Sequence, residues 1–352
     1  MRYRKEHICS VMLIALLLIV VGGLLTSCSN DDTQESKSTS LQIMGFTRSG
    51  DPTQSYEGKG DYSPINLFLV DGETQKQEKQ GSARYNGSEW RISGFTNEDI
   101  GTSHTYSLYG FAPAEAIGSS LTVGAENTTL TLTGLPAVNA KDVCFIVGLQ
   151  RMEDVNTPKG SWDDYEGNFS FTTGSTAETK NLLYLLMDHV YASVCFTMAI
   201  DEEYAALRSI KIKKMELLST QNTTTATITL TPNNTGADPV QSVTYSSATG
   251  SSCSATFFES KVGDELTTFD TDKAKEYTCC FLPGLSNALT LVTTYDVYDR
   301  KGNKIDERTA SNKLPALTAL RGDRVTINLT VAPTYLGVLS DPDLDNPTIT
   351  IN

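Results

Sequence analysis

The stretch Leu182-Leu183-Tyr184-Leu185-Leu186-Met187, followed by Asp188-His189 and by the run from Val190 to Ile200, opens the second half of the chain. Apolar residues dominate it, and polar residues interrupt it only briefly. A continuous apolar run of this kind is typical of strands that are buried on both faces. We therefore expect a long buried strand that ends at Ile200.

Short predicted strands, separated by turn residues, flank this stretch on both sides. Asn86-Gly87, placed between two short runs that favour strands, predicts a hairpin with a type I′ turn. Further strands are expected at residues 41–47, 65–70, 105–111, 128–135, 141–149, 168–172, 210–215, 225–230, 255–258, 276–282, 289–298, 304–308, 324–331 and 348–351.

One short segment favours a helix. Residues 201–208 begin with acidic side chains and end with Arg208, an order that suits the helix dipole. Many short strands, one helix and no alternation of strands with helices predict an all-β fold of β-sandwiches. We expect two such domains, over residues 41–175 and 176–352, with the helix in the second.

The N-terminus has the pattern of an export signal, in which basic residues precede an apolar run from Ile8 to Val21. Leu25-Thr26-Ser27-Cys28 resembles the bacterial lipobox, in which the Cys thiol receives a diacylglycerol and the peptide is cut just before it. That resemblance implies a signal peptide over residues 1–27, a lipid on Cys28 and a polar, flexible tether over residues 28–40. The alternative is an uncleaved membrane anchor in which Cys28 is incidental.

The net charge of the 352-residue chain is −14. This charge argues against nucleic acid and anionic membrane surfaces as partners, because their phosphates would be repelled. The chain has seven cysteines, and five remain when Cys9 of the signal and Cys28 are set aside. An odd number without regular spacing does not predict a disulfide framework, and in apolar strands such thiols behave as small buried hydrophobes. These five are Cys144, Cys195, Cys253, Cys279 and Cys280.

The sequence predicts no catalytic residue, no metal site and no cofactor. His104 and His189 are the only histidines after the signal, and neither has an acidic or Cys neighbour at the spacing of metal ligands. No nucleophile elbow and no phosphate loop is present. A hydrolase with two carboxylates stays open as an alternative, because its spacing exists only in three dimensions.

Two short patterns have weak functional parallels. Asp341, Asp343 and Asp345 alternate like the start of a calcium loop, but the Gly of the sharp turn is missing and Asn352 stands where the bidentate Glu belongs. Arg321-Gly322-Asp323 matches the integrin-binding tripeptide, and a turn before the next strand explains it equally well.

Four features together resemble the fimbrillin family, the type V pilins and related surface lipoproteins of Bacteroidetes. They are the lipobox with the acidic Ser29-Asn30-Asp31-Asp32 behind it, the strand-rich first half through residues 106–113, the central run at residues 185–194, and a late appended strand. The family implies two transthyretin-like β-sandwich domains and export to the outer surface. It also implies that a protease cutting after Arg removes the first strand, whose groove a strand of another subunit then fills.

On this chain the resemblance implies residues 41–47 as the removable strand and Arg48 as the proteolytic maturation site, with an ordinary surface Arg as the alternative. Arg84 fits less well, because it lies inside the predicted hairpin. The candidate donor strand consists of Thr348, Ile349, Thr350 and Ile351.

The sequence thus predicts a structural and adhesive subunit of a surface fimbria, and not an enzyme. Its expected partners are other pilin subunits, the outer membrane through the lipid, and host or bacterial surface receptors. Its expected location is the outer membrane and, after maturation, the fimbrium. Two alternatives remain: a lipoprotein that binds glycans or another ligand without polymerising, and the hydrolase. An aromatic platform would favour the first and carboxylates clustered in a cleft the second.

Overall fold

The computed structural model describes residues 40–48, 51–55, 62–95, 99–154, 161–232, 235–246, 252–269, 274–284, 289–331 and 348–351. For residues 46–48, 51–55, 162 and 348–351 it describes the backbone alone. The predicted signal peptide, the lipid on Cys28, the tether up to residue 39 and the acidic pattern at Asp341, Asp343 and Asp345 lie outside these ranges.

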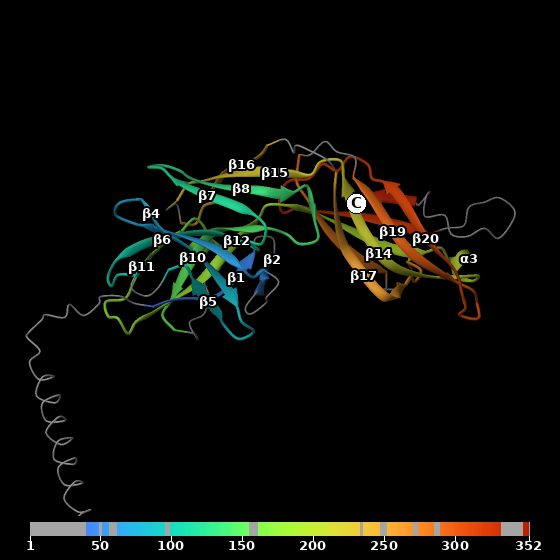
Figure 1. The fold of residues 1–352 in the computed structure, drawn as a ribbon, viewed down its shortest axis with the longest axis horizontal. Coiled ribbons are helices and arrows are strands. Elements are labelled where there is room, and N and C mark those ends of the chain that lie inside the picture. The colour runs from blue at the N-terminus through green and yellow to red at the C-terminus, as the bar shows by residue number, and fades with distance from the viewer. Residues whose placement is uncertain are drawn as a thin grey trace, which may run out of the picture. The chain divides into compact units, whose positions relative to one another are not determined.

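The described chain is nearly all β, which confirms the all-β part of the predicted fold class (Figure 1). Its strands are β1 (Ser40–Arg48), β2 (Asp51–Ser55), β3 (Ile65–Asp71), β4 (Gln77–Tyr85), β5 (Trp90–Ser93), β6 (Thr105–Ala112), β7 (Gly118–Val123), β8 (Thr128–Pro136), β9 (Val138–Asn139), β10 (Cys144–Met152), β11 (Ser170–Thr172), β12 (Lys180–His189), β13 (Ala192–Ile200), β14 (Ser209–Ser219), β15 (Thr223–Leu230), β16 (Val240–Tyr245), β17 (Cys253–Glu265), β18 (Lys275–Phe281), β19 (Thr290–Tyr298), β20 (Lys304–Lys313), β21 (Arg324–Val331) and β22 (Thr348–Ile351). The helices among these residues are α2 (Trp162–Tyr165) and α3 (Glu202–Ala205). Neither is long and apolar enough to cross a membrane.

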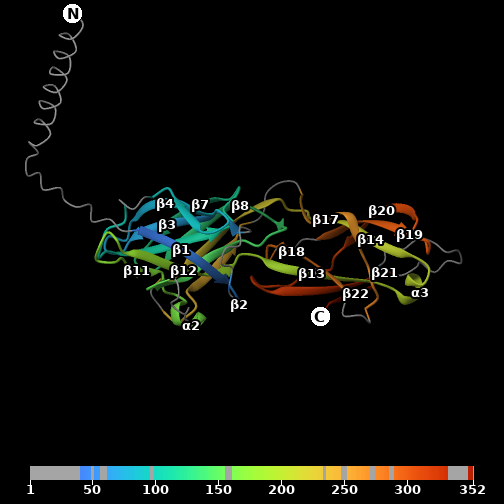
Figure 2. The same cartoon turned by 90° about the horizontal axis from the view of Figure 1, so that it is seen from below.

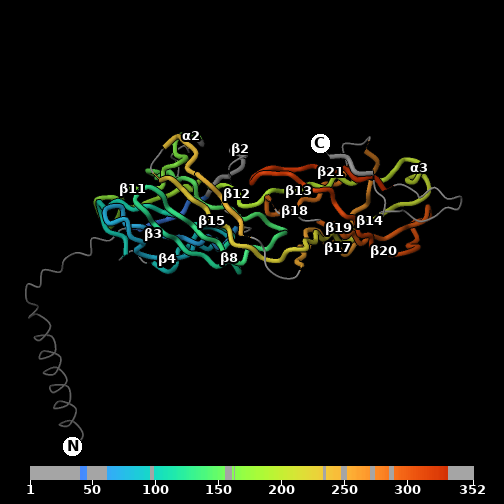
Figure 3. Tube along the Cα trace, turned by 90° about the horizontal axis from the view of Figure 1, so that it is seen from above, coloured from blue at the N-terminus to red at the C-terminus, as the bar shows by residue number. Residues whose placement is uncertain are grey.

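The first core lies between two sheets. One has the order β2-β1-β12-β10-β6-β3-β4-β5, with β11 paired to β6, and the other has the order β16-β15-β8-β7. Every second residue of β15 is buried, so that strand turns one face to the core and the other to solvent. In Figure 3, β15 lies beside β8. The two strands pair although β15 follows β8 by nearly a hundred residues in the sequence.

The second core lies between a sheet with the order β22-β21-β13-β18-β9 and a sheet with the order β17-β14-β19-β20. Side chains from both sheets meet there, including Phe196, Met215, Leu291 and Ile327. Figure 2 shows β13 with β21 and β22 along one side of this core.

The apolar run of residues 182–200 contributes to both cores. Residues 181–188 in β12 are buried without a break, as predicted for a strand covered on both faces, and they lie in the first core's sheet. The strand predicted from residue 190 begins instead at Ala192, because Val190 and Tyr191 pack into the first core and β13 joins the second. The two transthyretin-like domains and their boundary at residue 175 stay predictions.

The predicted helix is confirmed as α3, and its sequence explains where it starts. The Asp201 carboxylate accepts a hydrogen bond from the backbone N–H of Tyr204, as an N-cap does, and Tyr204 is buried. The four-residue helix α2 was not expected. It begins and ends within one turn, so the sequence holds no helical period that would reveal it.

Candidate functional site

Strand β1 is the candidate site, because it is the strand that the resemblance makes removable. It pairs in parallel with β12, from Ser40 opposite Lys180 to Arg48 opposite Met187, with one irregularity between Ile43 and Gly45. The buried Asn181 side chain donates a hydrogen bond to the Ser40 carbonyl at 2.8 Å. Strand β1 is therefore an integral part of the sheet.

The edge of β1 that faces away from β12 is only partly covered, because its partner strand there, β2, is short. There β2 pairs with two residues, Thr47 and Arg48, at the C-terminal end of β1. Since β2 follows Arg48 in the chain, a cut after Arg48 would separate β1 from β2 and from the rest of the protein. The loss of β1 would leave the backbone N–H and C=O groups on the β1-facing edge of β12 without a hydrogen-bonded partner strand.

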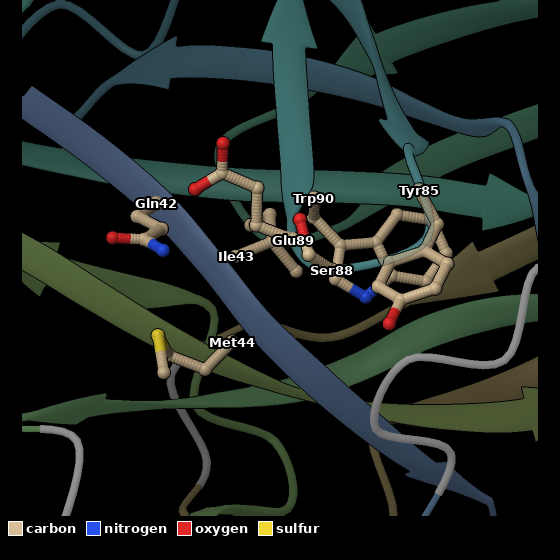
Figure 4. A pocket seen from close by; sticks show the side chains of 7 residues that line it. All are labelled: Gln42, Ile43, Met44, Tyr85, Ser88, Glu89 and Trp90. Atoms are coloured by element: carbon tan, nitrogen blue, oxygen red, sulfur yellow. The ribbon is translucent and has the colours of Figure 1, made fainter.

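A cavity of about 250 Å³ lies between β1 and the hairpin of β4 and β5 (Figure 4). The Ile43 side chain is 1% exposed and is turned toward Trp90, which is 4% exposed. The rings of Tyr85 and Trp90 lie 5.5 Å apart at an angle of 50°. The cavity is lined by Gln42, Ile43, Met44, Tyr85, Ser88, Glu89 and Trp90.

This arrangement gives β1 one deeply buried anchor. Burial of an Ile side chain is worth about 1.5–3 kcal/mol, so any strand that replaces β1 gains by presenting an apolar side chain at the same place. Trp90 does not form the aromatic platform that a glycan-binding protein would need, because its ring is buried rather than exposed.

The two candidate cleavage residues differ in their surroundings. Arg48 is the last residue of β1, and its backbone pairs with Met187 and Asp51. Arg84 lies inside β4 and pairs with Arg91 of β5, as the hairpin prediction requires. A protease needs an extended segment that it can pull free, and the pairing with Arg91 holds Arg84 within the hairpin.

The hairpin itself is confirmed, but the predicted type I′ turn is wrong. That turn needs a positive φ at both central residues, and of Asn86 and Gly87 only Gly87 has one, at 102°. The loop spans four residues instead of two. The Asn86 side-chain oxygen accepts hydrogen bonds from the backbone N–H groups of Ser88 and Glu89, which fixes the wider turn.

The candidate donor residues do form a strand, β22, at one end of the second core's five-stranded sheet (Figure 2). Thr348, Ile349, Thr350 and Ile351 pair antiparallel with Thr330, Leu329, Asn328 and Ile327 of β21. A strand at this position is held on one edge only, so its exchange to another subunit would break one ladder of hydrogen bonds.

Both described histidines have partners that sequence spacing did not reveal. His104 Nε2 lies 2.6 Å from Asp71 Oδ2, and His189 Nδ1 is hydrogen-bonded to Asp142 Oδ2. Backbone N–H donation from Thr74, together with the bond to His104, lowers the pKa of Asp71 to about 2. The expectation that neither His has an acidic or Cys neighbour at metal-ligand spacing holds along the chain, but in space Asp71 lies beside His104 and Asp142 lies beside His189.

The Cys144 thiol completes a three-residue cluster with Asp142 and His189, since it donates to Asp142 Oδ2 at 3.2 Å. The described cysteines form no disulfide, and all but Cys253 are buried, in agreement with the prediction of small buried hydrophobes. Burial raises the pKa of the Cys279 thiol well above its usual range.

The charged side chains of the tripeptide Arg321-Gly322-Asp323 make contacts within the protein. The Arg321 guanidinium pairs with Asp188 and lies over the Phe145 ring, 5.9 Å from its centroid. The Asp323 carboxylate accepts a hydrogen bond from the backbone N–H of Leu320 at 2.8 Å. These contacts support the interpretation of the tripeptide as a turn that leads into β21.

No protein-family model matches the chain, and a search of curated protein sequences returns no match. Solved structures similar to it include a fimbrial protein from Bacteroides vulgatus, with 11% identity, a TM-score of 0.43 and coverage of 90% of this chain and 98% of that one. Another is a protein assigned to cell adhesion from Bacteroides fragilis, with 14% identity, a TM-score of 0.45 and coverage of 90% and 97%.

The fimbrial anchor protein Mfa2 from Porphyromonas gingivalis is also similar, with 10% identity, a TM-score of 0.33 and coverage of 90% of this chain and 97% of that one. These similarities are distant in both identity and TM-score.

Proposed function

We propose that the protein is a structural and adhesive subunit of a surface fimbria, exported as a lipoprotein on Cys28 and assembled by strand exchange after cleavage at Arg48. The observation that carries this proposal is the placement of β1. It is a sheet strand with one buried apolar anchor, it is the first strand of the chain in the described residues, and it ends at an Arg.

Cleavage would turn a stable sheet into an acceptor. Along β12, the eight registered positions from Lys180 to Met187 would lose their partner strand, and the place of Ile43 beside Trp90 would open. Unpaired strand edges and vacant apolar pockets are both relieved by the addition of an extended strand. The subunit would therefore stay monomeric before cleavage and become able to receive another subunit afterwards.

The donor in this proposal is β22, which leaves β21 of its own chain and enters the vacated groove of the next subunit. Exchange of one strand for another conserves most backbone hydrogen bonds, so the gain comes from filling the open groove. The two transthyretin-like domains over residues 41–175 and 176–352, the outer-membrane location and surface receptors belong to the same proposal.

Limited digestion with trypsin tests the proposal directly. We expect a new N-terminus at Ser49, identified by mass spectrometry, followed by ladders of heat-resistant polymers on gels of unboiled samples. Arg48→Ala should prevent both the cut and the ladder, whereas the matched control Arg84→Ala should behave like the wild type. A clean cut after Arg48 that leaves a stable monomer would reject strand exchange.

A further inference from the structure

The cluster of Asp142, Cys144 and His189 follows from sheet register. Cys144 is the first residue of β10 and lies directly opposite His189, the last residue of β12. Asp142 precedes Cys144 by two residues, the spacing at which extended backbone turns side chains to the same side. Three chemically different ligand groups are thereby brought to one end of the sheet, and their ligand atoms all lie within 4.8 Å of one another.

We propose that these three residues bind a divalent transition metal ion of the zinc type. Thiolate, imidazole and carboxylate are the groups that hold zinc in proteins, and three of them with water in the fourth position complete a tetrahedron. The carboxylate of Asp142 and the thiolate of Cys144 balance the two positive charges of the ion. On binding, the Cys144 thiol releases its proton to solvent and the sulfur forms a bond to the metal, with no change of oxidation state.

The burial of the three residues favours tight binding of an ion. Cys144 is fully buried, Asp142 is 8% exposed, and the His189 side chain, at 16%, leaves a path to solvent. The His189 backbone N–H donates to Asp188 Oδ1 at 2.7 Å, which fixes the residue that presents the ring. The positive charge of Arg321 is already paired with Asp188, so it does not oppose the ion fully.

The hydrogen bonds present in this structure are compatible with the proposal. His189 Nδ1 and Cys144 Sγ both contact Asp142 Oδ2, so the same three atoms that would ligate the metal already converge. An ion would replace those bonds and join the start of β10 to the end of β12. This is the point at which the chain leaves the first core for β13 of the second.

Cobalt(II) titration of the purified chain tests the site, with Co²⁺ as a spectroscopic substitute for zinc. We expect one equivalent of Co²⁺ to give the intense visible bands of tetrahedral cobalt and a near-ultraviolet thiolate-to-cobalt charge-transfer band, both abolished by one equivalent of Zn²⁺. Zn²⁺, but not Mg²⁺, should also raise the melting temperature of the wild type. A wild-type chain that shows neither the bands nor the shift overturns the proposal without any variant.

Variants then assign the ligands. Cys144→Ser should remove the charge-transfer band, and His189→Gln should weaken Co²⁺ binding by more than about tenfold. The matched control is Cys195→Ser, because Cys195 is also fully buried but contacts Arg324 instead of this cluster. If the charge-transfer band persists in Cys144→Ser, or disappears equally in Cys195→Ser, the metal binds elsewhere and the proposal is wrong.

Discussion

Asp71 and His104 illustrate what single residues contribute to this protein. They are 33 residues apart in the sequence, yet their side chains meet at 2.6 Å at the end of β3. The Asp71 carboxylate also accepts hydrogen bonds from the backbone N–H groups of Thr74 and Glu73, which close the turn after β3. These bonds stabilise the charged carboxylate and account for its low pKa.

This pair makes a specific contribution to stability that depends on pH. The pKa of Asp71 is lowered from 3.8 to about 2 in the folded protein, so its stabilising effect is fully present above pH 4 and is lost as the pH falls toward 2. We expect Asp71→Asn to lower the free energy of unfolding at pH 7 and to have progressively less effect between pH 4 and pH 2.

Urea unfolding of wild type and variant at several pH values measures this difference. Asp154→Asn is a suitable control, because Asp154 is also an aspartate but is exposed to solvent. A difference between wild type and Asp71→Asn that stays constant from pH 7 to pH 2 would show that the carboxylate charge is not the cause.

At the scale of elements, the two terminal strands of the described chain matter most. Strand β1 lies near one end of the first core's sheet, and β22 lies at one end of a sheet of the second core. Strand β22 can leave without interrupting its sheet, and the departure of β1 would detach only β2, which pairs with two of its residues. An exchange of strands requires such positions near the end of a sheet.

Deletion of β22 separates cleavage from assembly. A chain that ends at residue 347 should still be cut after Arg48, because β1 and its neighbours are unchanged, but it should form no ladder of its own. Gel analysis with and without boiling measures the outcome. As a matched control, Asp343→Asn, outside the strand, should polymerise normally, and polymers formed by the shortened chain would contradict β22 as donor.

The position of the short helix α2 depends on a neighbouring strand, β10. The backbone of β10 bridges to Glu166 at Gly148, and a Cβ atom on Gly148 would clash with the Tyr165 carbonyl oxygen. Only glycine permits that approach, because the atom next to the missing side chain is backbone and cannot move aside. The helix is therefore positioned by a residue that lies outside it.

At the scale of the whole molecule, Arg321 links the two cores. It precedes β21 of the second core, and its guanidinium pairs with Asp188 of β12 in the first. Its side chain is 24% exposed and that of Asp188 is 11% exposed, so solvent screens the pair only in part.

Removal of this link should lower both the stability of the protein and the cooperativity between its cores. We expect Arg321→Ala to cost about 1–3 kcal/mol, because the buried Asp188 carboxylate loses its guanidinium, and to broaden or split the calorimetric transition. Arg324→Ala is the matched control. Arg324 pairs with Glu276 and also contacts the Cys195 sulfur. The Arg324 and Glu276 side chains are both more than half exposed, so the cost should stay below about 1 kcal/mol. Equal effects of the two substitutions would argue against a linking role for Arg321.

The sequence by itself determined the properties that are carried by neighbouring residues. Alternation in β15, the continuous burial of β12, the hairpin around Gly87 and the capped helix α3 all follow from side chains within a few positions of one another. For the same reason, an Arg directly after the first predicted strand could be identified before its surroundings were known.

The tertiary structure alone decided which strands pair and which side chains meet. Backbone hydrogen bonds join any two strands with the same chemistry, so the pairing of β15 with β8 and the placing of β1 beside β12 leave no local trace. The register that sets Cys144 opposite His189 is equally non-local, and it converts three ordinary residues into one cluster. Period and turn chemistry are local and can be predicted, whereas pairing depends on how the whole set of strands shares its cores.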